Sequence, residues 1–166
     1  GVFGLYDLIG IDLMADVLKS FIKELPESDP FQPVAREMPL VKKLIETGYT
    51  GRKGKGGFYR MNKEGGKKIL EAINLETGEY SPSKKIDIKS EKVDLKKLIN
   101  RGDKYGDYAW SVISKIIKYS SSLVPGITDK FNDIDEAMRL GFNWSRGPFE
   151  MLKEIGVNNF FQKIDN

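Results

Sequence analysis

The residues best suited to chemistry lie in one basic, glycine-rich segment, Gly51-Arg-Lys-Gly-Lys-Gly-Gly-Phe-Tyr59. Glycines let backbone amides approach an anion, and Arg52, Lys53 and Lys55 add positive charge, so the chemistry would be phosphate binding. The spacing, however, is neither G-x-x-x-x-G-K-S/T nor a strand-led G-x-G-x-x-G, and no helix follows to receive the phosphate. The pattern therefore favours a structural turn in which the two aromatic residues anchor a strand, with phosphate binding as the alternative.

The same segment lies in the most basic part of the chain, since residues 51–100 hold 13 Lys and Arg against 7 Asp and Glu. Aromatic rings among cations are typical of nucleic-acid surfaces, where the rings stack on bases. The residues that would form such a surface are Arg52, Lys53, Lys55, Phe58, Tyr59, Arg60, Lys63, Lys67 and Lys68. No recognisable nucleic-acid-binding module surrounds them, so we predict no nucleic-acid partner.

A second candidate is the carboxylate cluster Asp133, Asp135 and Glu136. Asp133 and Glu136 have the spacing of a capping box in which Asp replaces Ser or Thr, and this explains two of the carboxylates without a metal ion. Nearby, Gly147-Pro-Phe149 resembles an aromatic patch, but at a helix start such residues usually pack between helices. We therefore predict no metal site and no catalytic residue in this region.

The chain contains no cysteine and no histidine, and this limits the reactions that its side chains could catalyse. Disulfides, thiol nucleophiles, His-based zinc sites and Ser-His or Cys-His pairs are thereby excluded, and a self-contained enzyme is not expected. The composition, 40% hydrophobic and 31% charged, is that of a globular protein. Asp7, Asp12 and Asp16 interrupt the apolar N-terminal stretch, which predicts a soluble, cytoplasmic protein with no membrane segment.

The elements that position these residues can be read from the spacing of apolar and turn residues. Leu5 to Leu25 predicts one helix, from the apolar spacing of Leu5, Leu8, Ile9, Leu13, Val17 and Phe21. Pro39 and Gly48 bracket a second helix. Lys68 to Tyr80 predicts a hairpin with Gly78 in the turn, and a helical turn at Ile69–Ala72 is the alternative. A short helix around Val93 to Ile99 is expected in the connector that follows.

The second half is expected to be helical. A long helix is indicated by the apolar row Tyr108, Val112, Ile116, Tyr119 and Leu123, which stops at Pro125. The next helix is predicted to begin at Asp133 and to end at Gly141, and Pro148 to begin another. We therefore divide the chain into residues 1–62, a first helical repeat truncated at its N-terminus; 63–104, a hairpin and basic connector; and 105–166, a second helical repeat.

We interpret the two helical parts as repeats because one motif occurs in both of them. Gly1, Phe3, Ile9 and Gly10 recur as Gly147, Phe149, Ile155 and Gly156, an offset that also pairs Leu5 with Met151 and Ile11 with Val157. Helix-like sequence precedes the second copy, whereas the chain begins inside the first copy and without methionine. We therefore expect the chain to be a piece of a longer protein.

The repeated motif resembles one family. Asp133-Ile-Asp-Glu-Ala-Met-Arg-Leu-Gly-Phe-Asn-Trp-Ser-Arg-Gly-Pro-Phe-Glu-Met-Leu152 is similar to the signature of the C-terminal helical domain of NAD-dependent 3-hydroxyacyl-CoA dehydrogenases. Gly1 to Asp12 is similar to its second half, which reads G-P-F-E-L-x-D. Gly51 to Tyr59 resembles the G-R/K-K-x-G-x-G-F-Y tail of that domain. Val2 and Gly4 depart from the proline and glutamate of the motif.

The resemblance implies tandem helical repeats with a small β-hairpin insert, following an upstream Rossmann domain. The family oxidises (S)-3-hydroxyacyl-CoA to 3-oxoacyl-CoA with NAD in fatty-acid β-oxidation, using a His and a Glu of the Rossmann domain. A substrate-side Asn would lie on a helix that precedes Gly1, and the corresponding helix of the second copy has Ser and Lys there. The resemblance thus implies that this fragment alone is inactive.

We accordingly expect the two halves to pack face to face and to supply part of the acyl-CoA cleft and an interface. NAD would be bound by the missing Rossmann domain, and CoA phosphates would be bound by Arg52, Lys53 and Lys55. The resemblance also admits an accompanying enoyl-CoA hydratase domain and a homodimer. The alternative function is a non-catalytic helical interaction module.

Overall fold

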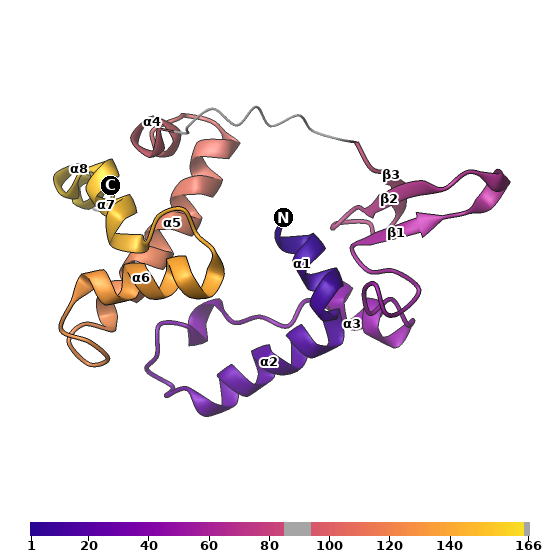
Figure 1. Ribbon diagram of the computed structural model, residues 1–166, viewed down its shortest axis with the longest axis horizontal. Helices are drawn as coiled ribbons and strands as arrows, with labels where there is room; N and C mark the ends of the chain where they lie inside the picture. Colours follow the sequence, from indigo (N-terminus) through magenta and orange to yellow (C-terminus); the bar gives the residue numbers. More distant parts are fainter. Residues whose placement is uncertain (85–93, 165–166) are drawn as a thin grey trace. The chain divides into compact units, whose positions relative to one another are not determined.

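The computed structural model describes residues 1–84 and 94–164, and the chain divides into two compact units, Gly1–Asp87 and Ile88–Asn166. Figure 1 shows the elements of each unit, and the units are described separately. Within the described residues, the first unit has three helices and a three-stranded sheet, and the second has five helices. The prediction of a mainly helical chain with a small β element is confirmed. The boundaries at 62/63 and 104/105 and the face-to-face packing stay predictions.

The first unit begins with two helices that meet at Gly10. Helix α1 spans Val2–Ile9, and α2 spans Ile11–Glu24. The prediction of one continuous helix over Leu5 to Leu25 is wrong, because Gly10 has φ 118° and ψ 124°, a conformation that L side chains rarely adopt. The Ile11 N–H leaves the helical pattern and donates to the Thr50 carbonyl oxygen at 3.1 Å. This contact ties the α1–α2 junction to the glycine-rich loop.

A short helix and a sheet complete the first unit. Helix α3 spans Pro39–Glu46, and Gly48 follows it with a positive φ of 81°, as predicted. The strands are β1 (Tyr59–Asn62), β2 (Ile69–Ile73) and β3 (Tyr80–Pro82), antiparallel in the order β1-β2-β3. Gly78, with φ 75°, lies in the β2–β3 turn, which confirms the hairpin. The alternative of a helical turn at Ile69–Ala72 is wrong.

The core of the first unit is small. Ile11, Leu44 and Phe58 are buried at its centre. Around them lie the partly buried residues Tyr6, Leu40, Val41, Ile45, Tyr49, Tyr59 and Ile73. The apolar row that predicted the first helix is exposed instead, with Leu8 at 58% exposure. The apolar spacing therefore indicated helical structure here, but it indicated neither the break at Gly10 nor which helix faces are buried.

The described part of the second unit contains five helices joined by turns, and no strand. Its helices are α4 (Leu95–Ile99), α5 (Lys104–Ser122), α6 (Phe131–Phe142), α7 (Pro148–Ile155) and α8 (Val157–Ile164). The short helix predicted around Val93 to Ile99 is α4, although Val93 lies outside the described residues. Asp94 and Asp103 cap α4 and α5, because their carboxylates accept backbone N–H groups of the first turns.

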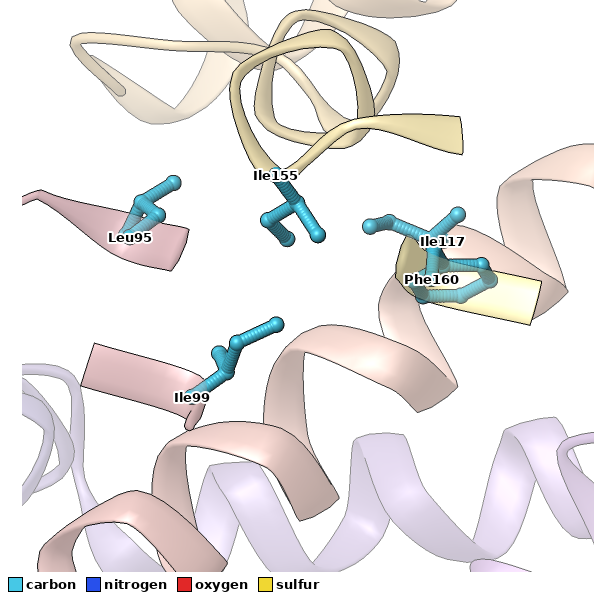
Figure 2. Close-up of a cluster of buried hydrophobic side chains, with 5 residues drawn as sticks. All are labelled: Leu95, Ile99, Ile117, Ile155 and Phe160. Atoms are coloured by element: carbon cyan, nitrogen blue, oxygen red, sulfur yellow. The ribbon is translucent and has the colours of Figure 1, made fainter. Parts of the chain in front are cut away.

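Five buried side chains form the core of the second unit. They are Leu95, Ile99, Ile117, Ile155 and Phe160, which come from α4, α5, α7 and α8 and are drawn in Figure 2. The Trp110 ring packs against Phe160 with centroids 5.3 Å apart. The row that predicted α5 again includes exposed residues, with Tyr108 at 72% exposure. The buried face of α5 instead carries Ser114, Ile117 and Ser120.

Helix α6 differs from its prediction at both ends. It begins at Phe131, so Asp133 lies inside the first turn, where it accepts a hydrogen bond from the Thr128 hydroxyl at 2.8 Å. The predicted capping box is therefore wrong. The helix ends at Phe142, and Asn143 rather than Gly141 has the left-handed conformation (φ 53°, ψ 36°).

The two copies of the motif share a backbone geometry. Each begins with an eight-residue helix, α1 or α7, that ends at a glycine with positive φ: Gly10 (φ 118°, ψ 124°) or Gly156 (φ 90°, ψ 124°). The Gly10 N–H donates to the Tyr6 oxygen at 2.8 Å, and the Gly156 N–H donates to the Leu152 oxygen at 2.9 Å. These are equivalent positions at an offset of 146, so the sequence repeat is also a local structural repeat.

This geometry predicts opposite effects for two Gly-to-Ala substitutions in the second unit. Gly156→Ala should lower the free energy of unfolding by about 2 kcal/mol, because Ala is strained at φ 90°. Gly141→Ala should raise it by about 0.5 to 1 kcal/mol, since Gly141 lies within α6 and no heavy atom lies within 4 Å of the position that an added Cβ would occupy. Urea unfolding followed by tryptophan fluorescence measures both changes in the free energy of unfolding. Equal changes for the two variants would contradict the positive φ described for Gly156.

Candidate functional site

A basic groove on the first unit brings α1, the glycine-rich loop and the sheet together. Its volume is about 690 Å³. Helix α1 and the residue before it contribute Gly1, Gly4 and Asp7; the loop contributes Arg52 and Lys55; and the sheet side contributes Arg60, Met61, Lys63 and Leu70. Five of the lining residues carry a charge, the acid Asp7 and the cations Arg52, Lys55, Arg60 and Lys63, so the lining is predominantly basic.

The glycine-rich loop is a closed turn rather than an open phosphate loop. The Gly51 N–H donates to the Gly56 oxygen at 2.7 Å, and the Gly54 N–H donates to the Gly51 oxygen at 3.0 Å. Gly51 and Gly56 have φ of 106° and 133°, which explains the glycines without any ligand. The loop leads directly into β1, so no helix N-terminus follows it. The structural-turn interpretation therefore describes its backbone, and phosphate binding would rest on the side chains.

Asp7 holds this loop to α1. Its side chain is buried, and its two carboxylate oxygens accept hydrogen bonds from the Phe58 N–H and the Tyr59 N–H, each at 2.8 Å. The Asp7 carbonyl oxygen also accepts the Arg52 N–H at 2.7 Å. A Cβ at Gly57 would overlap the Asp7 carboxylate, so only glycine fits there. One aspartate, Asp7, therefore joins the glycine-rich segment Gly51–Tyr59 to helix α1.

The sequence analysis missed the role of Asp7, although a signal was present. In the repeat alignment, position 7 corresponds to Lys153. The two copies therefore differ in charge at this position, and only the first copy has an acidic side chain there. This difference was the available signal.

Arg60 is held in a second cluster beside the groove. Its Nε donates to Glu71 Oε2 at 2.7 Å, and its guanidinium lies 4.1 Å from the centroid of the Tyr80 ring. Glu71 Oε1 accepts from Asn62 Nδ2 at 3.0 Å. The Asn62 hydrogen bond, followed by that of Arg60, holds the pKa of the Glu71 carboxyl below its usual value. The charge of Arg60 is therefore balanced within the sheet, and Glu71 is a second residue that the sequence analysis missed.

Tyr80 in this cluster predicts a pH dependence at alkaline pH. Its hydroxyl donates to the Gly57 oxygen, and burial raises its pKa from 10.0 to about 12. The unfolded chain thus loses this proton before the folded chain does, so stability present below pH 10 should fall between pH 10 and 12. Tyr80→Phe should be less stable at about pH 9 but should decline less over this range, as measured by circular dichroism. Parallel declines in the two proteins would contradict this assignment.

The structure brings two of the three predicted phosphate-binding residues together. Arg52 and Lys55 line the groove, joined by Lys63. Lys55 Nζ also donates to the Thr47 oxygen at 3.1 Å. Lys53 does not line the groove, because its Nζ lies 2.9 Å from Asp12 Oδ1. This hydrogen bond lowers the pKa of the Asp12 carboxyl.

One of the two aromatic rings considered for a nucleic-acid surface, that of Phe58, is buried. Phe58 is only 5% exposed, and its ring packs against Phe3 and Tyr6 with centroids 4.8 and 6.0 Å away. A buried ring of this kind cannot stack on a base. Phe58 is therefore a core residue that anchors the tail.

The carboxylates near Asp133 are separated by the fold. Asp135 is buried and accepts the Phe149 N–H at 2.8 Å, whereas Asp133 contacts Thr128. Pro148 is fully buried, and the partly buried Phe149 ring packs on the half-exposed Phe131 ring with centroids 4.6 Å apart, so these residues contribute to packing between helices without belonging to the central core. Within residues 1–84 and 94–164, no cluster of three acidic, His or Cys side chains is arranged to hold a metal ion. None of the helices in these ranges is long and apolar enough to cross a membrane.

Comparison with known proteins finds one family model that matches part of this chain. Residues 1–61 match the family model described as 3-hydroxyacyl-CoA dehydrogenase, C-terminal domain. The chain is 43% identical over 166 residues to a putative fatty acid oxidation complex trifunctional enzyme of Rickettsia felis, covering 100% of this chain and 23% of the relative. A protein of the same description from Rickettsia prowazekii is 42% identical over 164 residues, covering 99% and 22%.

A more distant relative carries a related description. The probable 3-hydroxyacyl-CoA dehydrogenase of Bacillus subtilis is 32% identical over 171 residues, covering 98% of this chain and 21% of the relative. The chain thus spans less than a quarter of the length of these curated relatives. No solved structure gives a significant match.

Proposed function

We propose that this chain, whose residues 1–61 belong to the 3-hydroxyacyl-CoA dehydrogenase C-terminal domain family, is the C-terminal helical part of a fatty-acid β-oxidation enzyme. The parent protein would oxidise (S)-3-hydroxyacyl-CoA to 3-oxoacyl-CoA with NAD. The observation that carries this proposal is the family match over the motif and its tail, joined by the hydrogen bonds of Asp7 to Phe58 and Tyr59. The relatives named above support it along the whole chain.

The chain's own role would be structural and substrate-positioning. It contains no histidine, so the catalytic His of such a reaction would come from another domain of the parent protein. The described residues also do not fit NAD, because the glycine-rich loop runs from α3 into a strand rather than from a strand into a helix. NAD, when bound by an upstream Rossmann domain, would accept the hydride. This chain would complete the acyl-CoA cleft and form an interface.

The groove is where a CoA phosphate would contact this chain. Arg52 and Lys55 line it and are exposed, so they can meet a phosphate without first breaking a carboxylate pair. Lys53 was predicted as a third contact, but it would have to leave Asp12 before it could contribute. An enoyl-CoA hydratase domain in the parent protein, a homodimer and a cytoplasmic location belong to the same proposal.

A second function is favoured by one observation. Both units expose rows of large apolar side chains on helices: in α1 and α2 these include Leu5, Leu8, Leu13 and Phe21, and in α5 they include Tyr105 and Tyr108. Exposed apolar rows of this kind mark protein–protein contacts. They suit a non-catalytic helical interaction module as well as they suit the interface of a dehydrogenase.

Activity assays separate the two functions. This chain alone should show no NADH-dependent reduction of acetoacetyl-CoA. The parent protein should be active, and truncating it before the residue equivalent to Gly1 should abolish activity or raise KM for the acyl-CoA strongly. A truncated parent with unchanged kcat and KM would overturn the proposal and favour the interaction module. Measurable reduction by this chain alone would contradict the location of the catalytic residues.

A further inference from the structure

A pocket of about 470 Å³ in the second unit has mostly apolar walls. Its lining includes residues of α6, α7 and α8, namely Phe131, Phe149, Leu152, Lys153 and Val157. Among the described residues that line the pocket, Lys153 alone is charged. The volume falls within the usual range of ligand pockets, and the lining suits an apolar group with a polar group beside it.

The repeat identifies the equivalent face of the first unit. At the offset of 146, the α7 and α8 residues of this pocket correspond to Phe3, Tyr6, Asp7 and Ile11. In the first unit this face is covered by Phe58, whose ring centroid lies 4.8 Å from that of Phe3 and 6.0 Å from that of Tyr6. Phe58 and Ile11 also share the buried core. In the first copy, this face of the motif thus binds an aromatic side chain from the segment that leads into β1.

The second copy keeps the apolar character of this face. Phe3 corresponds to Phe149, and the residues that correspond to Tyr6 and Ile11 are Leu and Val. Phe131 adds a second ring, which packs on that of Phe149 with centroids 4.6 Å apart. Aromatic rings pack favourably against other rings and against apolar side chains. An aromatic ring is therefore the group that the apolar part of this pocket fits.

The charge at position 7 differs between the copies. In the first copy, the Asp7 carboxylate accepts the N–H groups of Phe58 and Tyr59, each at 2.8 Å. In the second copy this position is Lys153, whose ammonium group only donates hydrogen bonds. A segment bound in the same pose would turn its two N–H groups towards another donor. The pocket instead requires an acceptor beside the ring, and a carboxylate suits best because it also pairs with the positive charge.

Lys153 is available for such a carboxylate. It is exposed, and within residues 1–84 and 94–164 it forms no ion pair. The neighbouring acids of α7 have other partners, since Glu150 pairs with Arg139 and Glu154 pairs with Arg146. The positive charge of Lys153 therefore faces the pocket without a described counter-charge.

The chain's own sequence offers no suitable occupant among its described elements. An aromatic residue is followed directly by Asp or Glu at Tyr6-Asp7 and at Phe149-Glu150. The first pair lies in α1 and the second in α7. Neither pair can enter the pocket of a second copy without unfolding its helix, which favours a partner protein as the source.

We propose that this pocket binds an extended segment of a partner protein in which an aromatic residue is followed directly by Asp or Glu. The ring packs against Phe131 and Phe149, and the carboxylate pairs with Lys153. The acid follows the ring because the two N–H groups that meet Asp7 in the first unit belong to Phe58 and to the next residue. This interaction does not depend on the proposed dehydrogenase activity.

Titration of blocked peptides into the isotope-labelled chain, followed by amide chemical shifts at low ionic strength, tests the proposal. The probe acetyl-Gly-Gly-Phe-Glu-Gly-amide should bind, with shift changes concentrated at Phe149, Lys153 and Val157. Replacing its Glu by Gln should weaken binding roughly threefold or more, and replacing its Phe by Ala should weaken it roughly tenfold or more. Binding of the Glu peptide should also weaken as salt rises.

Lys153→Asp is the decisive variant, because it gives the second copy the residue of the first copy. It should abolish the preference for the Glu peptide over the Gln peptide. It should also bind acetyl-Gly-Gly-Phe-Tyr-Arg-amide, the sequence of residues 56–60, more tightly than the unchanged chain does. Lys153→Gln, which adds no acid to α7, should lose the same preference, and tryptophan fluorescence shows whether each variant remains folded.

Lys115→Asp is the matched control. It makes the same change of charge at an exposed position of α5 that does not line the pocket, and it should leave the affinities for both peptides unchanged. The proposal is overturned if the Glu peptide does not bind, if the Gln peptide binds equally well, or if Lys115→Asp weakens binding as much as Lys153→Asp.

Two other occupants would give different results. A dimer of this chain that dissociates on Lys153→Asp substitution would assign the pocket to a second copy and refute the partner assignment. A longer parent protein that fails to bind the Glu peptide, although this chain binds it, would assign the pocket to a segment of the parent and refute it as well.

Discussion

Replacing Asp7 with Ala is expected to lower the free energy of unfolding of the Gly1–Asp87 unit by roughly 3 kcal/mol. The change removes the acceptor of two hydrogen bonds and leaves the buried Phe58 N–H without its partner. Phe58 is also one of the three buried core residues of this unit, so loosening the tail loosens the core. Amide hydrogen exchange should show Phe58 and Tyr59 exchanging much faster in the variant.

A comparison of two spectroscopic transitions and a control variant test whether this loss of stability arises in the first unit. Both tryptophans, Trp110 and Trp144, belong to the other unit, so tryptophan fluorescence reports unfolding there while circular dichroism reports both units. Asp7→Ala should shift the circular dichroism transition but not the fluorescence transition. Asp12→Ala is the matched control, because it breaks the partly exposed ion pair with Lys53 and should cost about 1 kcal/mol or less. Equal losses of unfolding free energy in the two variants would contradict the role assigned to the Asp7 hydrogen bonds.

The second large effect is expected in the core of the Ile88–Asn166 unit. Ile155→Ala should lower the free energy of unfolding of this unit by about 3 kcal/mol, because Ile155 has no exposed surface and the change leaves a cavity. Leu95, Ile99 and Phe160 surround it in Figure 2. Since Trp110 packs on Phe160, urea unfolding can be followed by tryptophan fluorescence.

Val157→Ala is the control for this substitution. Val157 begins α8 just after Gly156 and is 50% exposed, so its truncation should change stability by about 0.5 kcal/mol or less. A loss similar to that of Ile155→Ala would mean that α7 and α8 pack differently. An Ile155→Ala variant as stable as the unchanged chain would mean that α4 does not cover this core.

The two copies of the motif make different contacts because a few positions differ between them. In the first copy, Asp7 accepts the Phe58 N–H, and Gly4 and Asp7 are among the residues that line the basic groove. The second copy has Lys153 and Glu150 at the equivalent positions, and Glu150 caps its own helix and pairs with Arg139. Gly10 and Gly156 end their helices with similar backbone geometry, whereas the other two positions make different contacts.

Local rules predicted most of the elements. Pro39 and Pro148 begin helices, Gly48 follows α3 with positive φ and Gly78 lies in a hairpin turn, because each of these conformations depends on the residue's own backbone preferences. The same rules failed at two places. The apolar spacing predicted one continuous helix, which Gly10 divides into α1 and α2. The capping pattern predicted that the next helix begins at Asp133, but α6 begins two residues earlier, at Phe131, and Asp133 accepts a hydrogen bond from Thr128.

By itself, the sequence determined the repeat, the helical class, the resemblance to a family and the absence of histidine chemistry, because these depend on residue identity and spacing along the chain. Only the tertiary structure decided which helix faces are buried, that Asp7 holds residues 58 and 59, and that Lys53 pairs with Asp12 while Arg52 and Lys55 line a groove. These facts join residues some 40 to 50 positions apart. Such contacts depend on how the elements pack, and the spacing of residues along one element carries no record of its neighbours in space.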